Sequence, residues 1–241
     1  MRNSKAALIT GGAKRIGKAI ALYLASLGYD IALHYNTSKK ESLLLKSEIE
    51  NTGQKCVLFQ CDFYDLKKSL KLIKKVKQRF PSLCLLINNA SIFEKGLFLE
   101  TDISSLERHL NVNFKTPFVL SYDFAKLCKK GQIINMLDTN VVRKNSKYFA
   151  YNLSKKTLYD FTKMTAYELG PDIRVNGIAP GPILPPFGKD DGYLKIKARN
   201  IPLKRKGDVR YITKAIGFLL ENDFITGECL FVDGGKHLLS P

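Results

Sequence analysis

The sequence predicts one α/β domain, built on a doubly wound parallel β-sheet with helices on both faces. Short apolar runs alternate with amphipathic helical stretches along the whole chain. These runs are nearly continuous, which is typical of strands that are buried on both faces. A glycine-rich turn joins the first run to the first helical stretch. The 241 residues fit a single domain, 1–241, without an internal repeat or a linker.

Seven strands and the helices between them follow in order from this pattern. Apolar runs predict strands at 6–9, 29–35, 56–60, 83–87, 131–136, 173–179 and 229–232. Helical periodicity predicts helices at 15–27, 38–51, 66–80, 104–113, 117–129, 148–170 and 208–220. Thr52-Gly53 and Pro81 act as stop signals for the second and third helices. A segment rich in Pro and Gly within 180–207, which leads into a short helix, is expected to form a substrate lid.

Composition and charge argue against several functional classes. No apolar stretch approaches the ~18 to 20 residues that span a bilayer, and the first apolar run is too short for a signal-peptide core. We therefore expect a cytoplasmic protein. The five cysteines form no C-x-x-C pair and the three histidines are scattered, which argues against a disulfide framework and against a metal site. The net charge of +17 comes from lysines spread over several helices, which indicates solvated faces rather than a nucleic-acid-binding stripe.

The turn after the first strand is a candidate dinucleotide-binding loop. It reads Thr10-Gly11-Gly12-Ala13-Lys14-Arg15-Ile16-Gly17. Glycines permit a tight turn and allow a pyrophosphate to approach the N-terminus of the following helix. A glycine-rich turn alone is a weak signal, but its place between the first strand and the first helix strengthens the prediction.

The end of the second strand favours NADPH over NADH. An Asp or Glu there would bind the ribose 2′-hydroxyl and repel a 2′-phosphate. The sequence instead reads His34-Tyr35-Asn36-Thr37-Ser38 with Lys39 and Lys40 behind it, so hydrogen-bond donors replace the acid. Asp62, at the end of the third strand, is placed to reach the adenine.

Tyr151 and Lys155 lie four residues apart in a predicted helix, so their side chains share one face. A neighbouring ammonium favours the phenolate, and we expect it to lower the pKa of Tyr151 from its usual value of about 10. A tyrosine tuned in this way can donate a proton as a hydride arrives from a nicotinamide. The spacing is common on helix surfaces, but behind the fifth strand of a dinucleotide-binding sheet it predicts a reductase.

With these motifs in this order, the chain resembles the short-chain dehydrogenases/reductases, which have a Rossmann-like fold, over nearly its whole length. The matching segments are 10–17, Asn88-Asn89-Ala90, Asn113 before Pro117, Tyr151 with Lys155, 173–176, Pro180-Gly181, 225–227 and 232–235. The resemblance implies that Tyr151 is the acid, that Lys155 holds the nicotinamide ribose, and that Asn113 orders a proton-relay water. It also implies a homotetramer formed through helices 117–129 and 148–170.

One position narrows the subgroup. Most family members have a Ser about thirteen residues before the Tyr, where this chain has Asp138. A carboxylate repels a developing alkoxide but suits a ring nitrogen that gains a proton relayed with Tyr151. Asp138, Arg15 and the segment Ser91-Ile92-Phe93 together resemble pteridine reductases and bacterial dihydromonapterin/dihydrofolate reductases. This resemblance implies a pterin between the nicotinamide and the ring of Phe93, with Arg15 and Ser91 lining the same pocket.

The resemblance also completes the expected NADPH site. Its members are Gly11, Arg15, Ile16, Gly17, His34, Tyr35, Asn36, Ser38, Asp62, Asn89, Ala90, Ser91, Lys155, Pro180 and Gly181. Related pteridine reductases often have an Arg where Thr37 stands. The 2′-phosphate contact is therefore expected from Ser38, Asn36 and His34, with Lys39 or Lys40 as further candidates.

Other interpretations of these residues stay open. A carbonyl reductase, such as a 3-oxoacyl-carrier-protein reductase, would share the fold and the cofactor, and Asp138 is the feature against it. A non-catalytic dinucleotide-binding regulator would not need Tyr151, Lys155 and Asn113 together. Phe93 could be a packing residue and Asp138 a turn cap. Biopterin, monapterin and dihydrofolate are equally compatible with the sequence.

Overall fold

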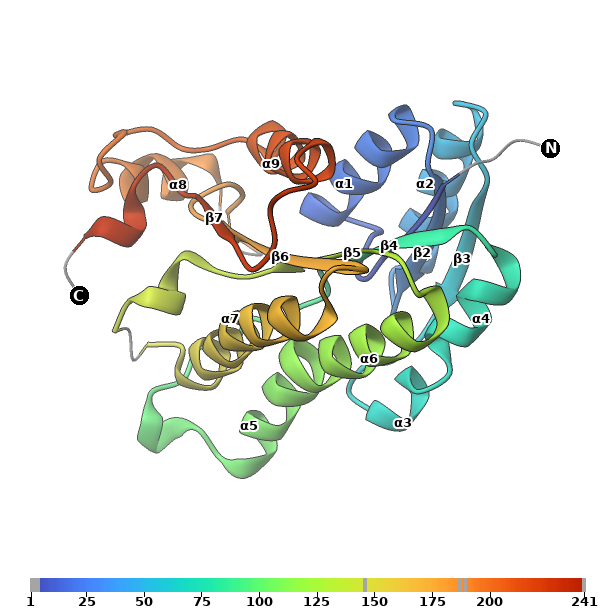
Figure 1. The fold of residues 1–241 in the computed structure, drawn as a ribbon. Helices are drawn as coiled ribbons and strands as arrows, with labels where there is room; N and C mark the ends of the chain where they lie inside the picture. The colour runs from blue at the N-terminus through green and yellow to red at the C-terminus, as the bar shows by residue number, and fades with distance from the viewer. Residues whose placement is uncertain (1–4, 145–146, 186–187, 189, 240–241) are drawn as a thin grey trace.

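The computed structural model describes residues 5–144, 147–185, 188 and 190–239. A seven-stranded sheet in the order β3-β2-β1-β4-β5-β6-β7 forms its centre, and neighbouring strands in this sheet run parallel to one another (Figure 1). The strands are β1 (Ala6–Ile9), β2 (Asp30–Tyr35), β3 (Cys56–Gln60), β4 (Leu83–Asn88), β5 (Gly131–Met136), β6 (Ile173–Pro180) and β7 (Cys229–Val232). The predicted doubly wound parallel sheet is thus confirmed.

Helices cover both faces of the sheet (Figure 1). One face carries α1 (Arg15–Ser26), α2 (Lys39–Glu50) and α9 (Val209–Glu221), whose apolar residues join one core cluster. The other face carries α4 (Leu72–Arg79), α6 (Thr116–Cys128) and α7 (Phe149–Leu169), which join a second cluster. The remaining α-helices are α3 (Leu66–Ser69), α5 (Ile103–Leu110) and α8 (Asp191–Ala198).

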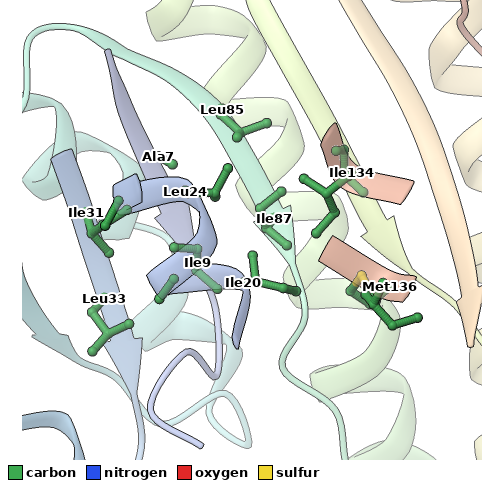
Figure 2. Close-up of a cluster of buried hydrophobic side chains, with 14 of the residues drawn as sticks. Ala7, Ile9, Ile20, Leu24, Ile31, Leu33, Leu85, Ile87, Ile134 and Met136 are labelled. Carbon is green, nitrogen blue, oxygen red and sulfur yellow. The ribbon is translucent and has the colours of Figure 1, made fainter. Parts of the chain in front are cut away.

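The continuous apolar strands serve both clusters because successive side chains of a strand point to opposite faces. In β1, Ala7 and Ile9 pack toward α1, whereas Ala6 and Leu8 pack toward the α4 and α6 side. Figure 2 shows Ile20 and Leu24 of α1 among the side chains of the central strands. This packing holds the start of α1 against the carboxyl ends of β1 and β4, where the strand order reverses.

Two helical predictions differ from the structure. The helix expected at 66–80 is divided into α3 and α4, and the Ser69 hydroxyl donates to the Leu66 carbonyl at 2.7 Å, which competes with the helical ladder. The gap expected after residue 113 is instead a π-helical segment, η2 (Asn111–Lys115), that leads into α6. Pro117 is tolerated because it lies in the first turn of α6, where its missing N–H has no helical partner.

The five cysteines are free thiols. Burial raises the pKa of Cys56 and Cys229 to about 12, so both act as small uncharged core residues. Within the described ranges, no helix is long and apolar enough to cross a membrane.

Candidate active site

A cavity of about 1190 Å³ opens at the carboxyl edge of the sheet. It is lined by the predicted residues Gly11, Arg15, Ile16, Gly17, His34, Tyr35, Asn36, Ser38, Asp62, Asn89, Ala90, Ser91, Phe93, Asp138, Tyr151, Lys155, Pro180 and Gly181. Asn113 belongs to the predicted set but does not line the cavity. The sequence prediction therefore brings together residues from loops that are up to 170 positions apart, because parallel strands end at the same edge of the sheet.

The glycine loop forms a close-fitting cradle at the start of α1. Gly11 has a φ of +60°, and a Cβ there would lie 2.9 Å from the Cα of Ala90. A Cβ on Gly17 would lie 2.3 Å from the carbonyl oxygen of Gly11. Lys14, the N-cap residue of α1, makes no side-chain cap, and the first turn contains no acidic residue. The backbone N–H groups of this helix end therefore fit a pyrophosphate group.

Side chains from β1 and β4 hold this loop in place. The Nδ2 of Asn89 donates to the carbonyls of Thr10 and Gly11, at 2.9 and 3.1 Å. The Thr10 hydroxyl accepts the backbone N–H groups of Asn89 and Ala90, at 2.9 and 3.0 Å. Asn89 therefore acts on the cofactor site by positioning the glycine loop.

Arg15 follows the turn of the glycine loop and is the first residue of α1. Its φ is +54°, a left-handed conformation that costs a non-glycine residue on the order of 1 kcal/mol. Its Nη2 donates to the carbonyl of Pro185 at 2.6 Å. Arg15 thus links the glycine loop to the expected lid segment, and residues of both segments line the cavity. Positions 186, 187 and 189 of the lid region 180–207 lie outside the described residues.

His34 is buried and both of its ring nitrogens have partners within the chain. Its Nδ1 accepts the N–H of Gly11 at 3.0 Å, and its Nε2 lies 3.0 Å from the carbonyl of Cys61, to which it donates. The ring also stacks on Phe63 with centroids 4.0 Å apart. No ring nitrogen is left for a phosphate, which corrects the expected imidazole contact with the 2′-phosphate. His34 instead connects the glycine loop to the end of β3.

Burial lowers the pKa of His34 to about 4, so it stays neutral in the folded protein at neutral pH. In the unfolded chain its pKa is about 6.5, so unfolding takes up a proton between pH 6.5 and 4. We expect the free energy of unfolding to fall with pH in this window, with a loss of about 2 kcal/mol from His34 at pH 5.

Urea unfolding of the wild type and of His34→Gln at pH 7.5 and pH 5 tests this expectation. The stability difference between the two proteins should shrink by about this amount at pH 5. Because both proteins share every other titrating group, the comparison isolates His34. A difference that does not change with pH would show that His34 does not titrate as its burial implies.

The expected 2′-phosphate region contains an internal hydrogen bond and an unpredicted lysine. The Nδ2 of Asn36 donates to Asp62 at 3.1 Å. Lys39 and Lys40 do not line the cavity, whereas Lys14 does and pairs with Glu41 of α2 at 2.6 Å. Lys14 lies within the glycine loop, and its side chain was not predicted because only the fold brings that loop beside the start of α2.

Tyr151 and Asp138 form a direct pair in the cavity. The Tyr151 hydroxyl donates to Oδ2 of Asp138 at 2.9 Å. The other carboxylate oxygen, Oδ1, accepts the N–H of Asn140 at 2.7 Å and caps the short helix η3 (Thr139–Val142). Asp138 is therefore both a turn cap and a partner of the predicted acid, so the two interpretations of this residue are compatible.

The expected lowering of the Tyr151 pKa by Lys155 is wrong for this arrangement. Burial, the charge of Asp138 and the hydrogen bond to Asp138 together raise the pKa of Tyr151 well above its usual value. The ammonium of Lys155 donates to the carbonyl of Met136 at 2.7 Å, and burial lowers its pKa to about 8. The Tyr151 phenol therefore keeps its proton at neutral pH, which is the form that a general acid requires.

Asn113 lies in the π-helical segment η2 and is fully buried. Its Oδ1 accepts from the Ser91 hydroxyl and the N–H of Ile92, and its Nδ2 donates to the Ile92 carbonyl and the Ser154 hydroxyl. These four bonds use the whole capacity of the amide. Asn113 thus positions the segment after β4 against α7. The relay water expected at Asn113 stays a prediction, and other atoms of η2 would have to bind this water.

An aromatic group closes the wall beside the acid. The ring of Phe93 stacks on Tyr148 with centroids 4.3 Å apart and meets Tyr151 edge-on at 4.7 Å. Phe93 is 45% exposed and lines the cavity, so it both packs and offers apolar surface to a ligand. Tyr148 was missed from the sequence, although its position three residues before Tyr151 puts it on the same helix face.

Known proteins resemble the chain over its whole length. A family model described as enoyl-(acyl carrier protein) reductase matches residues 11–237. The uncharacterized oxidoreductase YohF of Escherichia coli (strain K12) is 31% identical, covering 99% of this chain and 98% of that protein. The 3-oxoacyl-[acyl-carrier-protein] reductase FabG of Staphylococcus aureus (strain Mu50 / ATCC 700699) is 30% identical, covering 99% of this chain and 100% of FabG.

A solved structure adds a further likeness. FolM alternative dihydrofolate reductase 1 of Brucella canis, complexed with NADP, matches with a TM-score of 0.94 at 34% identity, covering 100% of this chain and 97% of that one. The seven-stranded parallel sheet with helices on both faces agrees with this structural match. The chain therefore belongs to the short-chain dehydrogenase/reductase family of oxidoreductases.

Proposed function

We propose that this oxidoreductase uses NADPH to reduce a pterin-type substrate, converting a dihydropterin or dihydrofolate to its tetrahydro form. The hydrogen bond of 2.9 Å between Tyr151 and Asp138 carries the proposal. A carboxylate beside the proton donor disfavours a substrate that develops an alkoxide and suits a ring nitrogen that gains a proton. The resemblance to FolM, and the NADP in its structure, also support the substrate class and the cofactor.

The cofactor fits the residues present. The cradle at Gly11 and Gly17 and the uncapped start of α1 suit the pyrophosphate. Bound NADPH supplies the hydride. Lys155 lines the cavity and is buried beside Tyr151, which supports the role of holding the nicotinamide ribose that the resemblance implies. The rings of Phe93 and Tyr148 offer a flat ligand an apolar wall.

The proton moves through groups of this chain. Tyr151 keeps its proton because burial and Asp138 raise its pKa, so it is ready to donate when negative charge develops on the substrate. Asp138 accepts the Tyr151 hydroxyl and faces the same cavity, so it can pass a proton from solvent to Tyr151 or directly to the ring nitrogen. Asn113, as a positioning residue, keeps Ser91 at the edge of this space.

The second candidate is a 3-oxoacyl-carrier-protein reductase. Its support is the identity of 30% to FabG over the full length of that enzyme. The two candidates share the fold and the cofactor and differ in the expected role of Asp138. An assay of substrates therefore separates them directly.

We expect NADPH oxidation with dihydrobiopterin, dihydromonapterin or dihydrofolate, and none with acetoacetyl thioester. Absorbance assays with purified protein, repeated with NADH, measure both preferences. Turnover of the thioester alone would leave the fold and cofactor intact but would refute the pterin proposal. Faster turnover with NADH would contradict the cofactor preference that the missing acid after β2 predicts.

Assembly and location are parts of the same proposal. The helices α6 and α7 expose large apolar side chains, namely Phe118, Tyr122, Met164 and Tyr167. Apolar surface of this kind is typical of an interface between subunits, and we assign the expected homotetramer to this face. The cytoplasmic location, expected because the sequence has neither a bilayer-spanning apolar stretch nor a signal-peptide core, remains a proposal.

A further inference from the structure

Cations gather at the substrate end of the cavity. Its lining there includes Arg143, Lys144, Lys147, Lys197 and Lys236. Among the described lining residues, the acids are Asp62, near the predicted adenine position, and Asp138. Asp138 already accepts hydrogen bonds from Tyr151 and from the N–H of Asn140. Among the described residues that line the cavity, basic side chains therefore outnumber carboxylates.

Three separate segments bring these cations together. Arg143 follows η3, Lys197 belongs to α8, and Lys236 begins the short helix η4 (Lys236–Leu238). In Figure 1 these three segments lie on the same side of the molecule, at the end of the sheet opposite β3. The lysines of α2 and α4, by contrast, lie on outer helix faces. The cluster is therefore a product of the fold and not of a basic run in the sequence.

A buried carboxylate fixes Lys236 in the cluster. Asp233 accepts from the Thr139 hydroxyl, which joins the segment after β7 to η3. It also accepts the N–H groups of Gly235 and His237, at 2.9 and 2.7 Å. The side chain of Asp233 is thus occupied within the chain, and its hydrogen bonds hold η4 against the cavity wall.

The positive charges of these side chains also repel one another. Burial lowers the pKa of Lys236, and the charges of Arg143 and Lys197 lower it further, against the opposite effect of Asp138 and Asp233. Lys197 is exposed and lies over the ring of Tyr193 at 5.7 Å. An anion at this place would relieve the repulsion between the three cations.

The cofactor phosphates do not account for this cluster. They fit the glycine loop at the start of α1, whereas Lys236 begins η4, which the hydrogen bond from Thr139 to Asp233 ties to η3, directly after Asp138. The region between Tyr151 and Lys236 is where the part of a substrate beyond its reacting ring would extend.

We propose that Arg143, Lys197 and Lys236 form a subsite for a negatively charged substrate tail, and that its ligand is the carboxylate-bearing tail of a folate-type pterin. This inference rests on the proposed function and deepens it, because a pterin with a neutral side chain would leave the subsite empty. The phosphate of a pantetheine thioester has the same charge, and the experiment separates the two sources.

The test compares Lys197→Gln/Lys236→Gln with the wild type. Lys195→Gln is the matched control, because Lys195 is exposed on the same helix but does not line the cavity. We expect the double variant to raise KM for dihydrofolate about tenfold relative to KM for dihydrobiopterin. The control should leave this ratio as it is in the wild type. An equal change with both pterins, or no change, would overturn the inference.

A binding experiment keeps this result separate from the proposed reaction. p-Aminobenzoylglutamate, which is the folate tail without its pterin, is titrated into the NADP-loaded wild type and double variant by calorimetry. Weaker binding to the double variant supports the subsite even if no pterin is reduced, in which case only the proposed function fails. Equal binding to both proteins, or a defect confined to acetoacetyl-coenzyme A, would contradict a carboxylate subsite.

Discussion

Replacing Tyr151 with Phe is expected to lower kcat for reduction about a thousandfold. The substitution removes the hydroxyl that donates to Asp138 at 2.9 Å and leaves the buried ring in place. General acids contribute about 10² to 10⁴ in rate, and no other described phenol bonds to Asp138. Steady-state assays with NADPH and the best pterin of the substrate panel measure the effect.

Two further measurements distinguish chemistry from folding in this variant. The melting temperature and the binding of NADPH should be close to those of the wild type, because the ring and its neighbours remain. Tyr211→Phe is the control, since Tyr211 lies on α9, is 39% exposed and does not line the cavity. A Tyr151→Phe protein with nearly wild-type kcat would show that another group donates the proton.

Replacing Asp138 with Asn is expected to lower pterin reduction about a hundredfold, within the range that proton-transfer groups supply. The amide oxygen can still cap η3 by accepting the N–H of Asn140, and the side chain can still meet Tyr151. It cannot take up and pass on a proton. A loss of activity in this variant therefore reports proton transfer rather than the turn cap.

The pH profile gives an independent readout for Asp138. Its charge and its hydrogen bond both raise the pKa of Tyr151, so removing the charge lowers that pKa. We expect the alkaline limb of kcat/KM to move to lower pH in Asp138→Asn. The Asp138→Ser variant introduces the residue that most family members have at this position. It should lose pterin reduction but still bind NADPH. Pterin reduction that persists unchanged in Asp138→Asn would refute the assigned role.

Local patterns carried most of the fold prediction. Strand and helix periodicities repeat within a few residues, so the seven strands and their order along the chain follow from short segments of sequence. The parallel sheet then places the loop after β1 and the loop after β4 at one edge, which explains why Gly11, Asn89 and Tyr151 were expected together. The division of the helix at 66–80 was missed, because Ser69 acts through a hydroxyl contact that periodicity does not reveal.

Local sequence patterns do not predict the roles of several site residues. His34 was expected to face a phosphate, yet its nitrogens bond to Gly11 and Cys61, which are 23 and 27 positions away. The sequence spacing of Tyr151 and Lys155 suggested a lowered tyrosine pKa, but burial and Asp138 raise it. These effects depend on the depth of a group and on partners distant in the chain.

The sequence by itself determined the doubly wound sheet, the dinucleotide loop and the residues that surround the reacting end of the cavity. Only the tertiary structure decided that Asp138 bonds to Tyr151 while capping η3, that the amide of Asn113 bonds within the chain, and that cations from separate segments line one cavity. The physical reason is the separation along the chain over which each effect acts. Periodicity and turn chemistry act over a few residues, whereas burial, charge and hydrogen-bond partners are set by segments that meet only when the sheet has formed.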